Sequence, residues 1–415
     1  MLPPVLEIFV VWHPGDHVGL TIADEIVQHF RGTAFTGLVG GAVEVFVRCE
    51  GWASTDGPPR PIPSPGRPIT EHVQEARFTA VVPVLGLEMA AAVEGNGPWR
   101  AYMQEIAGTQ ADAPDRVVIF PYRLDAGSTD RTVLGSIMGK YQTIAAAAAE
   151  MPHDNDTDLR CRDLSQGLAQ FMSADKGSRL TAFISHTKHS ASAEIGDVIA
   201  LVTMVRDVIA ATHLRAFFDA SDLQPGTDWS GELVKHGGTS ALLALRTDLY
   251  PSREWCQREV LVAKRSGMPI VILDGIGYAE ERGSFLMDHV PRAPIRLDGS
   301  NWKRRDVYRA LNLLVDECLK RALWAHQYEL AKDIRALDVS WWAPHAPEPV
   351  TLVQWLESAK AADKLPKGDA MLRILHPDPP LGADEKEVLQ QMLAFGGLEG
   401  KLDVMTPRQL AARGG

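Results

Sequence analysis

The chain has 415 residues, 45% of them apolar, which is enough for two or three domains that each bury a core. A formal charge of −11 at pH 7 argues against direct nucleic-acid binding, which usually shows as a basic surface and a high pI. The four cysteines lie far apart without a CxxC pair, so they indicate neither a disulfide framework nor a structural zinc site. No apolar run reaches the roughly 18 residues that cross a bilayer. We therefore expect a cytoplasmic protein with no membrane partner.

Residues 1–151 are expected to form a doubly wound α/β domain. Continuous Val, Ile and Phe runs, rather than alternating ones, indicate strands that are covered on both faces, as in a parallel sheet with crossover helices. An alanine-rich stretch over 130–150 predicts a helix that closes the domain. The expected strands are 6–12, 43–49, 77–85 and 115–122, and the expected helices lie near 18–30 and 99–106.

The proline-rich stretch 56–68 (DGPPRPIPSPGRP) lies between the second and third of these strands. Proline at this density removes backbone donors and favours extended geometry. A ligand for a proline-recognition module is one interpretation of it. A stiff surface loop is the interpretation we favour.

Residues 152–178 are expected to form a linker with one helix around 164–172, and 179–330 a second α/β domain. A helix from about 304 to 328, with apolar residues at helical spacing, is expected to end that domain. The tail, 331–415, predicts a small α/β extension. Its Trp341 and Trp342 could form an exposed contact patch, but packing onto the preceding domain is the favoured interpretation.

The two large domains show a correspondence of order and pattern. Val10-Val11-Trp12-His13 and Phe183-Ile184-Ser185-His186 each end a first strand, and later strands and one helix match in sequence order. This indicates two copies of one domain type. The predicted fold class is therefore α/β, with two flavodoxin-like doubly wound parallel-sheet domains and a small C-terminal α/β extension.

Residues 180–325 resemble the Toll/interleukin-1 receptor (TIR) domains of bacteria and plants. Three blocks carry the resemblance: FISH at 183–186, DASDLQPG at 219–226, and SREWCQRE at 252–259. In enzymatically active TIR domains, a glutamate four residues after the tryptophan of the third block cleaves the nicotinamide–ribose bond of NAD. The resemblance implies this role for Glu259.

Local physics supports that assignment. Pro251 and Ser252 form a helix-start signal, with Ser252 expected to cap the helix. Helical spacing then places Trp255 and Glu259 one turn apart on one side, beside an apolar stripe of Cys256, Val260 and Ala263. The carboxylate is therefore expected near the carboxyl ends of the strands, where open α/β sheets bind ligands. The competing interpretation is a solvated helix glutamate.

One carboxylate is enough for this chemistry. Ordinary glycosidases need a second carboxyl group to protonate the leaving oxygen. The nicotinamide of NAD is already a cationic pyridinium and leaves as a neutral molecule, so it needs no general acid. What remains is stabilisation of an oxocarbenium-like transition state by one fixed negative charge.

Further substrate contacts follow from the resemblance. His186, Thr187 and Lys188 follow the first strand, where the family builds one wall of its nucleotide pocket. Asp222 belongs to the loop that gates the site and mediates TIR–TIR assembly in the family. Trp229 could stack on a base or simply pack. With Ser252 and Trp255, these residues complete the expected substrate-binding set.

No metal and no recycled cofactor are expected. His186 and His189 lack a third ligand at suitable spacing. The chain also has neither the GxxxxGK[ST] nor the GxGxxG phosphate-binding pattern, so NAD would be a substrate. In the first domain, the position four after Trp99 is Met103, and Trp12 replaces Ser185, which predicts a degenerate copy without catalysis.

The resemblance implies an NAD glycohydrolase that acts on assembly through its TIR domains, in antiphage defence or a related stress response. An activator or partner protein would supply the trigger. Two alternatives stay open at this point. One is a non-catalytic TIR scaffold, and the other is a module that binds a nucleotide signal without cleaving it.

Overall fold

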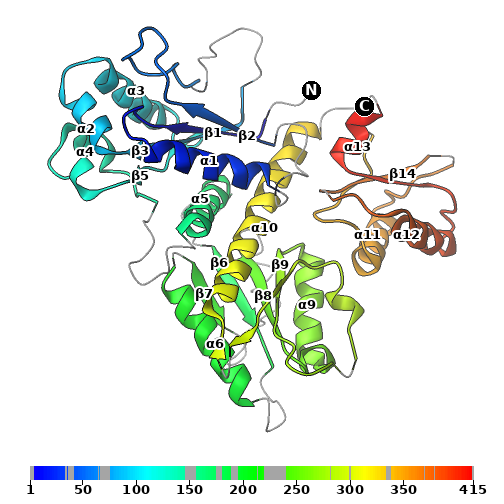
Figure 1. Ribbon diagram of the computed structural model, residues 1–415. Coiled ribbons are helices and arrows are strands. Elements are labelled where there is room, and N and C mark those ends of the chain that lie inside the picture. Colours follow the sequence, from blue (N-terminus) through cyan, green and yellow to red (C-terminus); the bar gives the residue numbers. More distant parts are fainter. Residues whose placement is uncertain are drawn as a thin grey trace. The chain divides into compact units, whose positions relative to one another are not determined.

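A computed structural model describes most of the chain (Figure 1). The chain divides into two compact units, Met1–Leu168 with Glu329–Ala331, and Ala169–Tyr328 with Lys332–Gly415. The described residues are 4–32, 35, 42–63, 65, 75–144, 156–173, 180–187, 195–212, 214–218, 240–280, 282–298, 301–332, 338–368, 370–377 and 379–413.

The first unit contains a parallel sheet in the order β2-β1-β3-β4, with the short β5 paired to β3. Strands β1 and β3 are buried along their whole length, as the continuous apolar runs predict. The strands are β1 (Leu6–Val11), β2 (Val43–Arg48), β3 (Phe78–Leu85), β4 (Val117–Ile119) and β5 (Tyr122–Arg123), and the helices are α1 (Val18–Arg31), α2 (Leu87–Glu94), α3 (Pro98–Asp112) and α4 (Val133–Met138).

Three details of this unit differ from the prediction. The expected strand 115–122 is split into β4 and β5, with Phe120 and Pro121 between them. Helix α2 was not predicted. The helix expected over 130–150 is limited to α4 within the described residues, because Thr132 caps its start and Gly139 follows its end. Residues 145–150 lie outside the described residues.

Helix α5 (Asp156–Met172) is the helix expected in the linker, and it packs on the first unit. The Arg160 guanidinium donates to Glu25 on α1, with Nη2 and Oε2 2.5 Å apart. The Ser165 hydroxyl lies 3.0 Å from Nε2 of His29, also on α1. Most of this segment therefore belongs to the first compact unit.

The second unit contains a parallel sheet in the order β10-β9-β8-β6-β7. Helix α9 packs on it through Cys256, Val260 and Ala263, the predicted apolar stripe, which lie in one cluster with core residues of β8 and β9. The strands are β6 (Thr181–Ser185), β7 (Arg215–Phe218), β8 (Ser240–Arg246), β9 (Ile270–Asp274) and β10 (Arg292–Pro294), followed by the hairpin β11 (Leu297–Asp298) and β12 (Asn301–Trp302). The helices are α6 (Ile195–Ala210), α9 (Glu254–Ser266) and α10 (Arg304–Ala331), with 3-10 turns η3 (Tyr250–Ser252) and η4 (Phe285–Met287).

The first four strands of each sheet have the same order when they are numbered from the sheet's own first strand. The first two strands of each domain, β1 and β2 or β6 and β7, lie on one side, and the next strand returns to the other side of the first. This is the flavodoxin-like order, so the fold class predicted from the sequence is confirmed. Its switch point, where ligands bind in such sheets, lies in the second unit between β6 and β8.

In its described residues, the C-terminal extension is a three-stranded parallel sheet, β13-β14-β15, with three helices. Trp341 stacks on Trp355 at 5.3 Å between ring centroids, and Trp342 lies 5.2 Å from Trp324 of α10. Trp342 therefore packs on a helix of the preceding domain, as the favoured interpretation predicts, whereas Trp341 packs within the extension itself. The elements are β13 (Trp341–Trp342), α11 (Pro349–Ala361), β14 (Leu372–Leu375), α12 (Ala383–Phe395), β15 (Leu402–Met405) and α13 (Pro407–Ala412).

Candidate functional site

Glu259 lies at the switch point of the second sheet. It belongs to α9, which follows the carboxyl end of β8, and its side chain contacts Ser185, the last residue of β6. Only 7% of Glu259 is exposed, so it is not the solvated helix glutamate of the competing interpretation. The structure therefore brings the carboxylate to the edge where open α/β sheets bind ligands.

Each carboxylate oxygen of Glu259 accepts a hydrogen bond. Nε1 of Trp255, one helical turn earlier, donates to Oε1 at 2.6 Å. The Ser185 hydroxyl donates to Oε2 and lies 2.6 Å from the hydroxyl of Tyr250. Two donors on opposite oxygens fix the plane of the carboxylate and suit its ionised form.

The direction of the hydrogen bonds follows from the groups themselves. The single proton of Ser185 is directed to Glu259, so the Tyr250 hydroxyl must donate to Ser185 Oγ. Burial, with the nearby Cys256 and Glu259, raises the pKa of Tyr250 well above its ordinary value, which keeps that proton in place. The result is a one-way relay from Tyr250 through Ser185 to Glu259.

A second contact, besides that of Ser185 with Glu259, joins α9 to the segment that follows β6. The thiol of Cys256 donates to the carbonyl of His186 at 3.8 Å, and His186 Nδ1 lies 3.1 Å from the carbonyl of Thr187. Thr187 is only 4% exposed, and its Oγ1 is buried without a hydrogen-bond partner in the described part of the chain. A buried hydroxyl of this kind is available to a ligand.

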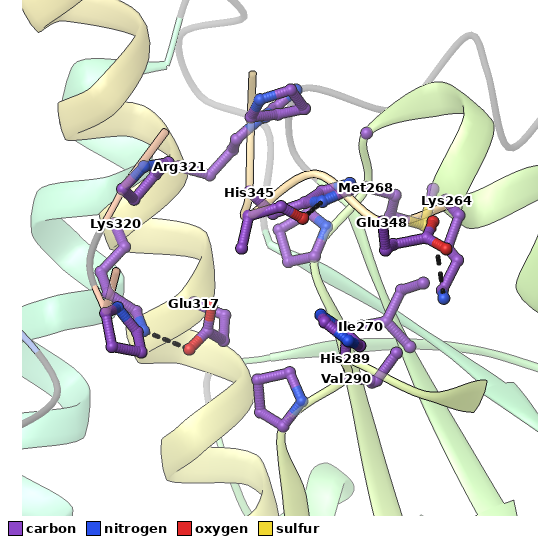
Figure 2. A pocket seen from close by; sticks show the side chains of 17 residues that line it. Lys264, Met268, Ile270, His289, Val290, Glu317, Lys320, Arg321, His345 and Glu348 are labelled. Atoms are coloured by element: carbon purple, nitrogen blue, oxygen red, sulfur yellow. Dashed lines mark hydrogen bonds and ion pairs between the residues drawn. The ribbon is translucent and has the colours of Figure 1, made fainter. Parts of the chain in front are cut away.

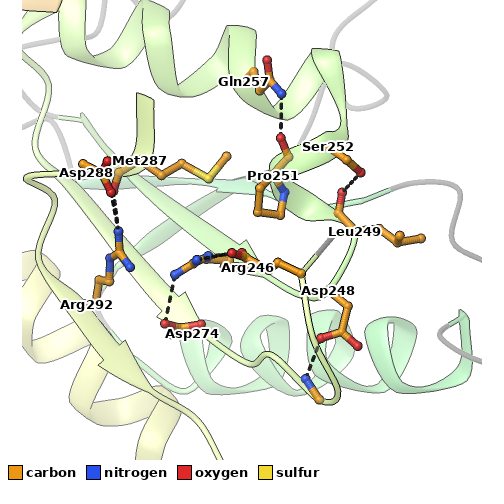
Figure 3. A network of polar contacts seen from close by, with 12 residues as sticks. Arg246, Asp248, Leu249, Pro251, Ser252, Gln257, Asp274, Met287, Asp288 and Arg292 are labelled. Carbon is orange, nitrogen blue, oxygen red and sulfur yellow. Dashed lines mark hydrogen bonds and ion pairs between the residues drawn. The ribbon is translucent and has the colours of Figure 1, made fainter. Parts of the chain in front are cut away.

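Ser252 does not cap α9, contrary to the prediction. It closes the 3-10 turn η3, where its hydroxyl donates to the carbonyl of Leu249 at 2.8 Å (Figure 3). Arg253 occupies the N-cap position without a side-chain cap. The Gln257 amide instead donates to the carbonyl of Pro251 at 2.6 Å, which ties the first turn of α9 to η3.

Lys188, Asp222 and Trp229 lie outside the described residues, as does His189. Their predicted roles in the substrate pocket and in assembly stay predictions. Of the predicted set, the structure brings Trp255 and Glu259 into direct contact. His186 and Thr187 lie at the end of β6 next to Ser185, and Ser252 lies in the turn before α9.

A polar network that was not predicted lies at the carboxyl ends of β8 and β9 (Figure 3). The guanidinium of Arg246 donates to both carboxylate oxygens of Glu280 at 2.5 Å and to Oδ2 of Asp274 at 3.2 Å. Asp274 Oδ1 and Thr247 Oγ1 are buried without hydrogen-bond partners among the described residues. Together with Thr187 Oγ1 after β6, these atoms place a buried polar group without a described partner at the carboxyl ends of β6, β8 and β9.

Ser185 and Tyr250 are the site residues that the sequence reasoning missed. Ser185 was visible in the FISH block as the last residue of a predicted strand, and strand ends of parallel sheets gather at one edge. Tyr250 carried no such signal. Its contact with Ser185 joins residues 65 positions apart, which no local spacing encodes.

In the first unit, the matching helix carries no carboxylate at the corresponding place. Met103 is fully buried in the core, whereas Glu105 is exposed. Trp12, directly after β1, is buried against Gly19 of α1. That the first unit is a degenerate copy without catalysis stays a prediction.

Among the residues that the structure describes, no group of three His, Cys, Asp or Glu side chains could hold a metal ion. No helix in the described segments has the length and apolar character needed to span a bilayer. No protein-family model matches the chain, and no curated protein matches its sequence.

Proposed function

We propose that the second unit cleaves the nicotinamide–ribose bond of NAD, with Glu259 as the catalytic carboxylate. The observation that carries this proposal is a buried carboxylate fixed by two hydrogen-bond donors at the switch point of the sheet. Three buried atoms at the same edge have no hydrogen-bond partner among the described residues, which supports a polar ligand there: Thr187 Oγ1, Thr247 Oγ1 and Asp274 Oδ1.

Glu259 would act as a preorganised negative charge. As the bond to nicotinamide breaks, positive charge develops on the ribose, and a carboxylate held away from water stabilises it strongly. Trp255 is 36% exposed and covers one oxygen of Glu259 from the solvent side, so rotation of its indole would open that oxygen to the ribose. Water or a base nitrogen of the same nucleotide would then complete hydrolysis or cyclisation.

The test compares nicotinamide release from NAD by the wild type, Glu259→Gln and Glu254→Gln, under crowding that favours assembly. Glu254 lies on the same helix with 92% of its side chain exposed, so it is the matched control. We expect a loss of about 100-fold or more for Glu259→Gln, the range for removing one preorganised electrostatic group. The control should keep the wild-type rate. Equal activity of all three proteins would show that the site is wrong.

A non-catalytic scaffold is the second candidate, and one observation favours it. Both oxygens of Glu259 already have protein partners, and the residue is 7% exposed, as expected for a structural carboxylate. In that case the wild type would not cleave NAD, and the only effect of Glu259→Gln would be a lower free energy of unfolding. Absence of nicotinamide release under all assembly conditions, with a lowered unfolding midpoint for Glu259→Gln, would establish the scaffold.

A further inference from the structure

A cavity of about 190 Å³ lies within the second unit at the other end of α9 (Figure 2). Lys264 at the end of α9 and Glu348 before α11 lie on one side of it, and Glu317, Lys320 and Arg321 of α10 line the other. Its wall also includes Ile270, at the start of β9. The cavity therefore lies at the edge of the sheet where the strands begin, whereas Glu259 lies at the edge where they end.

Two of the cations in this wall are neutralised by protein carboxylates. Lys264 Nζ lies 3.7 Å from Glu348 Oε1, each side chain being 4% exposed, and donates to the carbonyl of Asp288 at 2.9 Å. Lys320 forms an ion pair with Glu317. The cavity charge is thus balanced except at one position.

That position is Arg321. Its guanidinium has no hydrogen bond or ion pair in the described part of the chain, although it is partly buried and packs beside Gly267. Burial lowers the pKa of Arg321 to about 10, so it still carries its charge at neutral pH. A cation withdrawn from water without a partner is costly, and a bound anion would offset that cost.

His345 adds a hydrogen-bond acceptor to the same wall. Its Nδ1 lies 3.1 Å from the carbonyl of Ala346, which can only accept, so Nδ1 carries the proton. Burial lowers the pKa of His345, which keeps the ring neutral and leaves Nε2 as an acceptor. The wall therefore combines the planar guanidinium of Arg321, which donates hydrogen bonds, with Nε2 of His345, which can accept one from a hydroxyl group.

We propose that this cavity binds a small phosphate-class anion, either inorganic phosphate or the terminal phosphate of a phosphomonoester. Arg321 donates to two of its oxygens, the bidentate geometry that guanidinium groups form with phosphate. His345 Nε2 accepts from the hydroxyl group that the monohydrogen phosphate ion carries, or that a phosphomonoester carries in its singly protonated form. The volume suits the ligand, since a cavity of about 150 Å³ already holds a benzene molecule.

The test measures binding by titration calorimetry and the shift of the unfolding temperature with inorganic phosphate, glycerol 3-phosphate, sulfate and acetate. We expect saturable binding of inorganic phosphate, with sulfate about tenfold weaker at neutral pH because it has no hydroxyl group for His345. Tighter binding of glycerol 3-phosphate would assign the site to phosphomonoesters, and weaker binding would assign it to the free ion. Acetate binding as well as phosphate would overturn the phosphate class.

Three variants separate binding from folding. Arg321→Met should abolish the phosphate shift while the ligand-free protein unfolds at the same or a higher temperature, because an unpaired charge has been removed. Arg321→Lys should retain weakened binding. Arg305→Met, an exposed arginine of the same helix, is the matched control and should bind as the wild type does. An unchanged shift in Arg321→Met, or no saturable shift in the wild type, would overturn the proposal. Because the readout is binding, it is independent of whether NAD is cleaved.

Discussion

The hydroxyl group of Ser185 donates a hydrogen bond to the carboxylate of Glu259 across 74 positions of sequence. This contact joins the end of β6 to α9 at the switch point of the sheet. Through Ser185, Tyr250 also becomes part of the site. Orientation of the carboxylate thus depends on a buried relay as well as on its own helix.

The relay predicts that the effects of Ser185→Ala and Tyr250→Phe on the free energy of unfolding are not additive. Ser185→Ala should lower the free energy of unfolding by about 1–3 kcal/mol, since the buried Tyr250 hydroxyl and one oxygen of Glu259 lose their partner. Nicotinamide release should fall as well. Urea unfolding of the single and double variants measures the coupling.

Tyr250→Phe is the second substitution of this double-mutant cycle. In the Ser185→Ala background it removes a hydroxyl that is already unpaired, so it should cost less than in the wild type. Additive effects of the two substitutions would contradict the relay.

Glu7 predicts a pH dependence in the first unit. It is 9% exposed on β1, and burial, with Glu44 and Glu75 opposed by Arg48, raises its pKa from 4.5 to about 7. A raised carboxyl pKa contributes stability that is full below pH 4.5 and is lost as the pH rises through 7. The loss corresponds to about 3 kcal/mol. Glu7→Gln should therefore raise the unfolding temperature at pH 8 and have little effect at pH 5.

The comparison of the two pH values is the control for that substitution. A glutamine that repacks badly would lower the unfolding temperature at both pH values. An equal shift at pH 5 and pH 8, of either sign, would show that Glu7 does not titrate in this range.

Two glycines predict opposite results for one substitution. A Cβ at Gly19 of α1 would lie 2.4 Å from Cγ of Trp12, which is buried, so Gly19→Ala should destabilise by about 1–3 kcal/mol. Gly108 of α3 has nothing within 4 Å of its Cβ position. Gly108→Ala should stabilise by up to about 1 kcal/mol, the gain in helix propensity. Calorimetric unfolding distinguishes them, and stabilisation by both would contradict the packing.

The buried pair of Lys264 and Glu348 predicts a further asymmetry. Lys264→Met leaves a buried carboxylate without its cation and should destabilise the second unit by about 3 kcal/mol. Glu348 keeps two backbone donors, from Val350 and Thr351, which limit the loss. Lys360→Met, on the exposed face of α11, is the matched control and should change stability by less than about 0.5 kcal/mol.

Local pattern was enough to predict much of the fold. The continuous apolar runs predicted β1 and β3, and the spacing in SREWCQRE predicted the contact of Trp255 with Glu259. Both depend on residues that are close in sequence. The common strand order of the two sheets followed from a comparison of patterns, since each copy has its elements in the same sequence.

The rest depended on contacts that local pattern does not contain. Ser252 has the residue type of an N-cap, but it is the last residue of the 3-10 turn Tyr250–Ser252. Arg253 is therefore the N-cap residue of α9, which begins at Glu254. Tyr250 meets Ser185 only because β6 and β8 are neighbours in the sheet. The anion cavity joins residues of α9, α10 and the C-terminal extension, so no single segment indicates it.

Helix α9 carries Glu259 at the carboxyl edge of the sheet and Lys264 at the amino edge, five residues apart. Each residue of an α-helix advances by about 100° around the axis. Insertion or deletion of a single residue between them would turn one of the two side chains out of its site, whatever residue was used. The segment from Glu259 to Lys264 can therefore accept substitutions during evolution, but its length should be the same in all homologues that keep both sites.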